Sequence, residues 1–351
     1  MTGMRAGQHS TISGARIAGI VSCVPTGTVS NEHFRPAFSD KVDEIAKMTG
    51  VRERRWAAEG QTTADLCQAA AARLLDRLGW AADSVDGLIF ISQTPDYRLP
   101  ATGCALHGRL GLRPGTIAFD VNLGCSGYPY GLWLASMMIA GGSAKRILLA
   151  VGDTISKTVD PDDRATAMVF GDAGTATALE ASEEGAAPAH FILGSDGAGE
   201  NNLIIPSGGY KRAPEATGRY EGRKLESLYM DGGEIFNFTL KAVPKLIEET
   251  IALSGSPAEA FDSFLLHQAN AFMIKHLTKK ARLPAEKVPI NIDRFGNTSS
   301  ATIPLLMTTD LAETLSKRSA LLGLFGFGVG YSWASAAIEV GPLECVETIE
   351  A

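Results

Sequence analysis

The feature that most constrains the fold of this chain is an internal repeat. Residues 85–93 (VDGLIFISQ) resemble residues 261–268 (FDSFLLHQ), and each segment follows an amphipathic stretch that ends at a glycine. The two glycines, Gly79 and Gly255, are as far apart as the aspartates at the second position of the two segments. Equal offsets at successive anchors indicate a duplicated unit. We predict helices in the two amphipathic stretches, residues 64–78 and 235–253.

A second pair of similar segments follows further along the chain. Residues 123–126 (LGCS) match residues 295–298 (FGNT), and residues 145–149 (KRILL) match residues 317–321 (KRSAL) at the same offset. Both copies therefore have the order helix, strand, strand-turn-helix, strand. Such alternation predicts an α/β fold in which helices pack on sheets.

The repeat also predicts how the chain divides and where a site would form. We expect two duplicated α/β halves, residues 14–180 and 181–351. Cys125 and Asn297 occupy equivalent turns of the two halves, and His267 stands at the end of a predicted strand. A pseudo-twofold relation between the halves would bring these three side chains together around one site.

Composition narrows the classes of function. The net charge of −7 disfavours a nucleic-acid or anionic-membrane partner, which needs a basic face. The longest uncharged stretch, residues 121–144, is broken by glycines and a proline, so we interpret it as a buried helix and not a membrane span. Five cysteines without a CxxC pair favour free thiols in a reducing cytosol. The first fourteen residues lack the apolar run of a signal peptide, and we expect this extension to be disordered and the protein to be cytoplasmic.

Cys125 differs from the other cysteines in its context. A predicted strand over residues 116–121 leads through a glycine-flanked turn at 124–127 into an apolar helix over residues 128–140. The turn places the thiol at a helix N-terminus, where unpaired amides and the helix dipole are expected to lower its pKa below the free value of about 8.5. Cys125 is therefore the candidate nucleophile. The remaining cysteines are interpreted as packing residues: Cys23, Cys67, Cys104 and Cys345.

His267 and Asn297 are the candidate partners of this thiol. His267 follows an apolar predicted strand, and Asn297 lies in a second glycine turn before a helix. Polar clusters at strand ends are where α/β proteins commonly build sites. Neutral histidine and asparagine can both donate to a thioester oxygen that becomes negative, as in a decarboxylation that produces an enolate. The same three residue types also form the set of a cysteine hydrolase, so residue type alone leaves both reactions open.

Three motifs decide between them, because together they resemble the active-site signatures of the β-ketoacyl-acyl-carrier-protein synthase III family. They are NLGCSG at residues 122–127, HQAN at 267–270 and GNTSSA at 296–301. The resemblance spans roughly residues 14 to 340 and includes TGVRER at 49–54, DPDDR at 160–164, FGD at 170–172 and the glycine-rich stretch 325–333. It implies a thiolase-like fold with α-β-α-β-α layers, a homodimer, and neither a metal nor a redox cofactor.

The resemblance also implies a reaction. Cys125 would take an acyl group from acyl-coenzyme A or from an acyl carrier protein. His267 and Asn297 would then stabilise the enolate formed when a malonyl thioester on acyl carrier protein loses carbon dioxide, and this carbanion would attack the acyl-cysteine. The amides of Cys125 and Val329 would form the oxyanion hole. Fatty acid or polyketide biosynthesis is the corresponding area of metabolism.

Residues that bind substrate are implied in the same way, and here the chain departs from the family. Asn270 would contact the phosphopantetheine arm, and Phe327 and Arg164 would contribute to the substrate site. The usual tryptophan and arginine that hold the coenzyme A nucleotide correspond to Glu44 and Met48. The aromatic that usually limits the depth of the acyl pocket corresponds to Leu99, and an arginine used for carrier-protein docking corresponds to Phe272. Nearby lysines could still offer a surface to an acidic partner: Lys275, Lys279 and Lys280.

Four functions follow from these observations. The first is a decarboxylating condensing enzyme, and the second is an acyltransferase that passes the acyl group from Cys125 to an oxygen or nitrogen nucleophile. The third is a catalytically silent partner subunit, which the intact cysteine, histidine and asparagine argue against. The fourth is a cysteine hydrolase, which the duplicated architecture argues against. We adopt the first interpretation.

Overall fold

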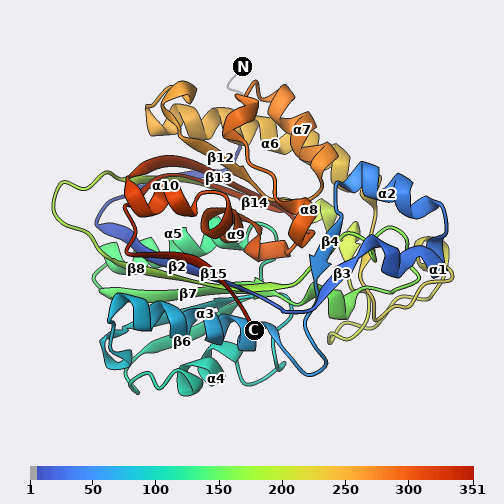
Figure 1. The fold of residues 1–351 in the computed structure, drawn as a ribbon, viewed down its shortest axis with the longest axis horizontal. Coiled ribbons are helices and arrows are strands. Elements are labelled where there is room, and N and C mark those ends of the chain that lie inside the picture. Colours follow the sequence, from blue (N-terminus) through green and yellow to red (C-terminus); the bar gives the residue numbers. More distant parts are fainter. Residues whose placement is uncertain (1–5) are drawn as a thin grey trace.

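The computed structural model describes residues 6–351, and Figure 1 shows two mixed β-sheets with helices between them and on their outer faces. The larger sheet has the order β15 (Cys345–Glu350), β2 (Ala15–Val24), β8 (Ala173–Ala181), β7 (Arg146–Asp153), β5 (Gly87–Ile91), β6 (Ile117–Val121). The smaller sheet has the order β1 (Gln8–Ile12), β9 (Ala189–Ser195), β14 (Ser332–Val340), β13 (Ala320–Gly328), β12 (Ser263–Leu266). Two-stranded sheets are formed by β3 (Thr28–Ser30) with β4 (Glu53–Arg55) and by β10 (Leu203–Ile204) with β11 (Tyr229–Met230).

The helices form three layers around these sheets. The outer face of the larger sheet is covered by α3 (Thr63–Leu78) and α4 (Thr102–Arg109), the space between the sheets holds α5 (Gly127–Ala140) and α9 (Thr302–Thr309), and the smaller sheet is covered by α6 (Gly232–Ser254) and α7 (Ala271–Lys280). The predicted α-β-α-β-α layering of a thiolase-like fold is thereby confirmed. The remaining helices are α1 (Arg35–Phe38), α2 (Lys41–Thr49), α8 (Ile292–Phe295) and α10 (Ala312–Lys317).

The apolar pattern of the central elements explains this layering. Helix α5 contacts strands of both sheets, so the nearly all-round apolar surface seen in its sequence is buried from both sides. Strand β5 is buried at every position, as expected for a parallel strand covered on both faces. No helix among residues 6–351 is both long and apolar enough to cross a bilayer.

The two sheets repeat one arrangement, which confirms the predicted duplication. Strands β5 and β7 are parallel and are continued by antiparallel β8 and β2, and β12 and β13 are parallel and are continued by antiparallel β14 and β9. The helices that precede β5 and β12 both end at a glycine in the left-handed conformation, Gly79 at φ 61° and Gly255 at φ 71°. Glycine adopts this conformation without a steric penalty, so the same residue ends the helix in each half.

One predicted element of the second half is wrong. A strand was expected before the turn of Asn297, as β6 precedes the turn of Cys125, but the segment contains the short helix α8. Pro289 has no N–H to donate to a sheet ladder. The N–H of Asn291 donates instead to the side-chain oxygen of Gln268 at 3.2 Å. The smaller sheet therefore ends at β12.

The chain termini also differ from expectation. Residues 8–12 form β1, which pairs with β9 and is therefore not disordered; the expectation for residues 1–5 lies outside the described residues. The Ala6 amide and the His9 ring both bind the Glu249 carboxylate of α6, which secures this segment. At the other end β15 pairs with β2 in the larger sheet. Division into halves at residues 180 and 181 stays a prediction, with this exchange of terminal strands added to it.

Candidate active site

One pocket between the two halves brings Cys125, His267 and Asn297 together. Cys125 lies two residues before α5, His267 directly follows β12, and Asn297 follows α8. All three side chains are buried. The three residues predicted as the catalytic set therefore share one site, although more than 100 residues separate Cys125 from His267.

The end of β13 closes tightly over Cys125. A Cβ atom placed on Gly328 would lie 2.8 Å from both Cβ and Sγ of Cys125, so the strand can approach only because this residue is glycine. The backbone amides of Val329 and of Cys125 itself are hydrogen-bonded to the sulfur and lower its pKa. These are the two amides predicted to form the oxyanion hole.

The acidity of the thiol differs from the expectation. Burial raises the pKa of Cys125 to about 11, against the opposing effect of the Val329 amide, and the Asp153 carboxylate raises it further. The expected lowering by the helix N-terminus is therefore wrong, because the loss of solvation outweighs the hydrogen bonds from the amides. At neutral pH the resting thiol keeps its proton.

His267 is neutral at the same pH. Burial lowers its pKa to about 3, and the backbone of Ser299 opposes this shift only in part. Its Nδ1 lies 2.8 Å from the hydroxyl oxygen of Thr302, and the edge of the imidazole faces the Phe327 ring at a centroid distance of 5.6 Å. The ring is thus held in place without a charged partner.

The two asparagines of the pocket are oriented by backbone amides. Oδ1 of Asn297 accepts a hydrogen bond from the Ser299 amide at 2.9 Å, which leaves its Nδ2 donors free for the pocket. Oδ1 of Asn270 accepts from the Met273 amide at 2.7 Å and caps α7, with the same consequence for its Nδ2. Both side chains therefore present donors to a ligand.

Much of the remaining lining is apolar and comes from segments for which the sequence predicted no role. Phe327, which was predicted, is accompanied by Phe170, Leu203, Met230, Ile235 and Met273. A pocket with an apolar wall and a few convergent donors suits an acyl chain or pantetheine arm whose thioester oxygen is to be held in one place. Their only sequence signal is apolarity, which packing residues share.

The relatives of the chain establish its family. The beta-ketoacyl-[acyl-carrier-protein] synthase III of Alkalilimnicola ehrlichii is 35% identical over 331 residues, which are 93% of this chain and 99% of the relative. The chain belongs to the β-ketoacyl-[acyl-carrier-protein] synthase III family. The enzyme of that name from Xanthomonas axonopodis pv. citri is 36% identical and covers 92% of this chain and 98% of its own length.

Family models and solved structures agree with this membership. The family model described as 3-oxoacyl-[acyl-carrier-protein (ACP)] synthase III matches residues 119–197, and its C-terminal counterpart matches residues 251–340. The 3-oxoacyl-(acyl-carrier protein) synthase of Burkholderia xenovorans LB400 superimposes with a TM-score of 0.97 at 57% identity, with 99% of both chains covered. The synthase III of Pseudomonas aeruginosa PAO1 gives 0.83 at 30% identity over 93% of this chain and 98% of its own. The synthase III family consists of acyltransferases, so the predicted enzyme class and recognition are confirmed.

Arg164 lies outside the pocket of this synthase III. It is exposed and lines a separate cavity with residues of α2, among them Lys41, Glu44 and Met48. The two positions at which the chain departs from the family are therefore in the same cavity as Arg164, as the resemblance implied. A carboxylate and a thioether stand here in place of an aromatic and a guanidinium.

Leu99 is not part of the pocket within one chain. Its side chain is 77% exposed on the loop between β5 and α4. The Asp120 carboxylate accepts from the Thr102 and Gly103 amides at 2.6 Å, which fixes the end of this loop over β6. The loop consequently directs Leu99 to solvent, and the expected limit on pocket depth is not supplied by the Leu99 of the same chain.

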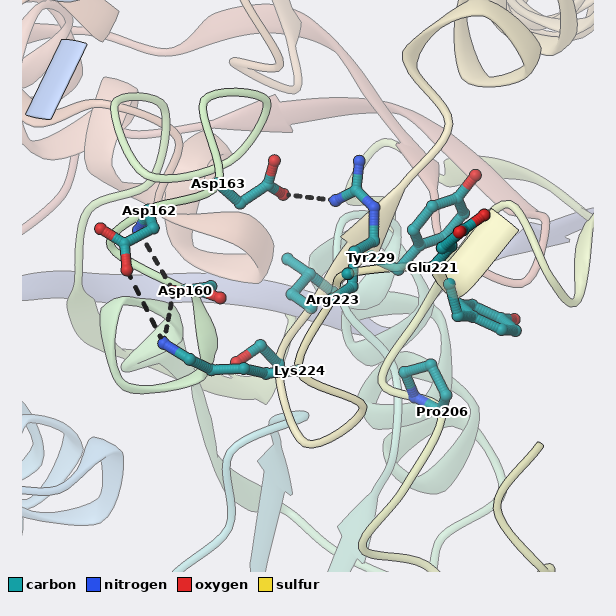
Figure 2. A pocket seen from close by; sticks show the side chains of 12 residues that line it. Asp160, Asp162, Asp163, Pro206, Glu221, Arg223, Lys224 and Tyr229 are labelled. Atoms are coloured by element: carbon teal, nitrogen blue, oxygen red, sulfur yellow. Dashed lines mark hydrogen bonds and ion pairs between the residues drawn. The ribbon is translucent and has the colours of Figure 1, made fainter. Parts of the chain in front are cut away.

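A further cavity of the synthase III fold lies between the turn 160–163 and the loop 206–229 (Figure 2). Figure 2 shows its charges already paired: Arg223 with Asp163 at 3.1 Å, and Lys224 with Asp160 at 2.9 Å. The predicted surface loop at 208–223 forms part of this wall. The ion pairs fasten the loop to the turn that carries Arg164.

Two polar residues near the catalytic set were missed from the sequence. Thr302 binds the imidazole of His267, and Asp153 influences the thiol of Cys125. Asp153 is the first charged residue after the apolar run of β7, which is the signal that drew attention to His267. Applied to every predicted strand, that signal would have found it.

Proposed function

We propose that this protein catalyses the decarboxylating condensation of an acyl thioester primer with a malonyl thioester on acyl carrier protein, through an acyl-Cys125 intermediate. The names of the relatives support this class of reaction. The observation that carries the proposal is the convergence of Cys125, His267 and Asn297 in one pocket with an apolar wall.

The first step transfers the acyl group to the enzyme. The sulfur of Cys125 attacks the carbonyl carbon of the donor thioester, a sulfur–carbon bond forms, and the donor's own carbon–sulfur bond breaks to release its thiol. The carbonyl oxygen becomes negative during the attack and accepts hydrogen bonds from the amides of Cys125 and Val329. Both amides already point at the sulfur, which supports their role.

The second step forms the new carbon–carbon bond. The malonyl thioester oxygen accepts from Nε2 of His267 and Nδ2 of Asn297 while its carboxylate leaves as carbon dioxide, and the electron pair of the broken bond enters the enolate. The enolate carbon attacks the acyl carbonyl, and Cys125 leaves as a thiolate that regains a proton. The Thr302 hydroxyl is closer to Nδ1, at 2.8 Å, than to the Ser299 carbonyl, at 3.1 Å. By donating to Nδ1 it places the ring proton on Nε2, where the reaction needs it.

The donor and the carrier protein are proposals of their own. The exposed Phe272 ring stacks on Phe236 beside the pocket residue Asn270, and the lysines of α7 flank it. This arrangement suits an acidic carrier protein that delivers its pantetheine arm past Asn270. Either acyl-coenzyme A or an acyl carrier protein could supply the primer. The altered cavity beside Arg164 favours a donor other than acetyl-coenzyme A.

A homodimer and a cytoplasmic location complete the proposal. Tyr97 and Leu99 are exposed on one loop, 52% and 77% respectively, and offer an apolar surface to a second copy of the chain. The five cysteines, all within the described residues, are free thiols, which fits a reducing compartment.

Intact-protein mass spectrometry tests the function directly. The purified protein is incubated with a panel of acyl-coenzyme A and acyl-carrier-protein thioesters, with Cys125→Ala as the control. We expect a gain of one acyl group that the control lacks, and a β-ketoacyl product with release of carbon dioxide after malonyl carrier protein is added. Acylation followed by transfer to an oxygen or nitrogen nucleophile would support the alternative acyltransferase, which no contact in the site favours. A folded protein that no donor acylates would overturn the proposal.

A further inference from the structure

Asp153, the last residue of β7, is a completely buried carboxylate that the mechanism above does not use. Its Oδ1 accepts from the Gln93 amide at 2.7 Å and the Ser92 hydroxyl at 3.0 Å, and its Oδ2 accepts from the Ser300 hydroxyl at 2.7 Å. All these partners are neutral. A carboxylate buried among neutral groups is costly when ionised, so its presence beside a reacting thiol calls for an explanation.

The partners of Asp153 pack on both sides of the turn that carries Cys125. Gln93 lies against Gly124, where a Cβ atom would be 3.0 Å from the side-chain Cδ of Gln93. Ser300 lies against Gly127, where a Cβ atom would be 3.5 Å from the Cβ of Ser300. One carboxylate thus holds the two residues that flank the nucleophile's turn.

Ser299 provides a connection between the carboxylate and the thiol. Its hydroxyl is close enough to both Asp153 and Cys125 to lower the pKa of each group. The residue is buried and has a positive φ of 52°, a conformation that residues other than glycine adopt rarely and that often marks functional sites. The Ser299 hydroxyl can accept a proton from the sulfur side and donate its own to the carboxylate side.

The charges of the two groups are coupled. Burial raises the pKa of Asp153, and the negative charge of Asp153 contributes to the raised pKa of Cys125. The other titratable groups near them are Cys67 on α3, whose pKa burial also raises, and His267, which burial keeps neutral. Since no cation takes part in this group, one negative charge is favoured over two, and it can reside on either Asp153 or Cys125.

We propose that Asp153 receives the thiol proton of Cys125 through the Ser299 hydroxyl during acylation, which makes Asp153 a positioning residue that acts through Ser299. The S–H bond of Cys125 breaks as its sulfur–carbon bond to the acyl group forms. Ser299 takes up this proton and passes its own to Asp153, and the departing donor thiolate is protonated when Asp153 returns the proton along the same path. The charge moves from the carboxylate to the leaving group and back, so the step balances without a further reactant. This inference rests on the acyl-Cys125 intermediate of the proposed function.

The decisive variant is Asp153→Asn, with two measurements on Cys125 as a function of pH. The first is the rate of acylation by the best donor, followed by intact mass. The second is the rate of alkylation by iodoacetamide, which reports the thiol pKa. We expect acylation at pH 7 to fall about 100-fold, a typical loss for a missing proton acceptor, and to rise steadily with pH. The thiol pKa should fall, because the repelling carboxylate has been removed. A merely structural role would not slow acylation while making the thiol more acidic.

Two further variants separate the path from the fold. Ser299→Ala keeps the carboxylate and its contacts with Gln93 and Ser300, so it should slow acylation as Asp153→Asn does but raise the thiol pKa. Asp172→Asn removes a different fully buried carboxylate, which binds Ser156 and the Ala57 amide, and should leave the shape of both pH profiles unchanged. If Asp153→Asn does not fold, the opposite pKa shift and slow acylation of Ser299→Ala still support the path.

The outcomes distinguish this inference from the function on which it rests. If no donor acylates the wild-type protein, the proposed function fails. If the wild-type protein is acylated and Asp153→Asn matches it in rate and pH profile, or is slowed equally at every pH, the proton path is overturned. Unchanged acylation by Ser299→Ala would overturn it as well.

Discussion

At the scale of single residues, burial dominates the protonation of the catalytic set. It raises the pKa of the Cys125 thiol and lowers that of the His267 imidazole, in both cases against hydrogen bonds that act the other way. Both side chains are therefore uncharged at neutral pH. A neutral histidine suits a donor to a developing oxyanion better than it suits a base.

The depressed pKa of His267 predicts how stability depends on pH. The unfolded chain protonates this side chain near pH 6.5, whereas the folded chain does so only near pH 3. Between these values the unfolded state binds the additional proton, so the free energy of unfolding should decrease by about 1.4 kcal/mol per pH unit as the pH falls. Urea denaturation at pH 7 and pH 5 measures the loss. In His267→Gln the loss should be smaller by roughly this contribution, and an equal loss would contradict the assignment.

Thr302→Val tests how the imidazole tautomer is controlled. Without the hydroxyl at 2.8 Å from Nδ1, the ring proton is no longer directed to Nε2, so stabilisation of the enolate should weaken. We expect decarboxylating condensation to slow by about 10- to 100-fold, within the range typical of general acid–base groups. Acyl labelling of Cys125, measured by intact mass, should stay within about twofold. Equal slowing of both steps would indicate a packing defect instead.

At the scale of elements, close approach at chain turns determines the shape of the site. The end of β13 reaches Cys125 across Gly328, and the turn before α9 reaches Asp153 through Ser300. Outside the pocket, the loop between β10 and β11 is held by ion pairs to the turn 160–163, as Figure 2 shows. The rigid part of the site is thus built from sheet ends, and its outer wall from a fastened loop.

The fastening of this loop predicts a change in protease sensitivity. Asp160→Asn removes the partner of Lys224 at 2.9 Å without altering any trypsin site, so cleavage in the loop at Arg212 and Arg219 should become faster. Because exposed ion pairs are screened, added salt should accelerate cleavage of the wild-type loop as well. Asp162→Asn is the matched control, since that carboxylate lies 3.9 Å from Lys224 and is largely exposed. Identical cleavage of the three proteins in low salt would contradict the role of the pair.

At the scale of the whole molecule, the two halves interlock through their terminal strands. Strand β1 from the N-terminus completes the smaller sheet and β15 from the C-terminus completes the larger one (Figure 1). Since each sheet depends on a strand from the far end of the chain, we expect both halves to unfold together in one transition.

The exposed loop that carries Tyr97 and Leu99 predicts the state of assembly. If the loop is buried against a second copy, Leu99→Glu introduces a charge into an apolar contact and should convert a dimer into a monomer. Size-exclusion chromatography with light scattering checks the mass at several concentrations. Glu183→Gln, a change at an exposed residue on another turn, is the control and should leave the mass unchanged. A wild-type protein of monomeric mass throughout would refute the dimer.

Local patterns in the sequence determined the main elements and the catalytic set. The repeat, the apolar run of α5 and the glycine turns at Cys125 and Asn297 depend on neighbouring residues, because helix and strand periods and turn geometry are properties of short segments. The tertiary structure alone decided the pKa of Cys125, the contacts of Asp153, the exposure of Leu99 and the pairing of β1. Each of these depends on solvation or on contact with segments far away in the sequence. Those quantities exist only once the two halves have packed together.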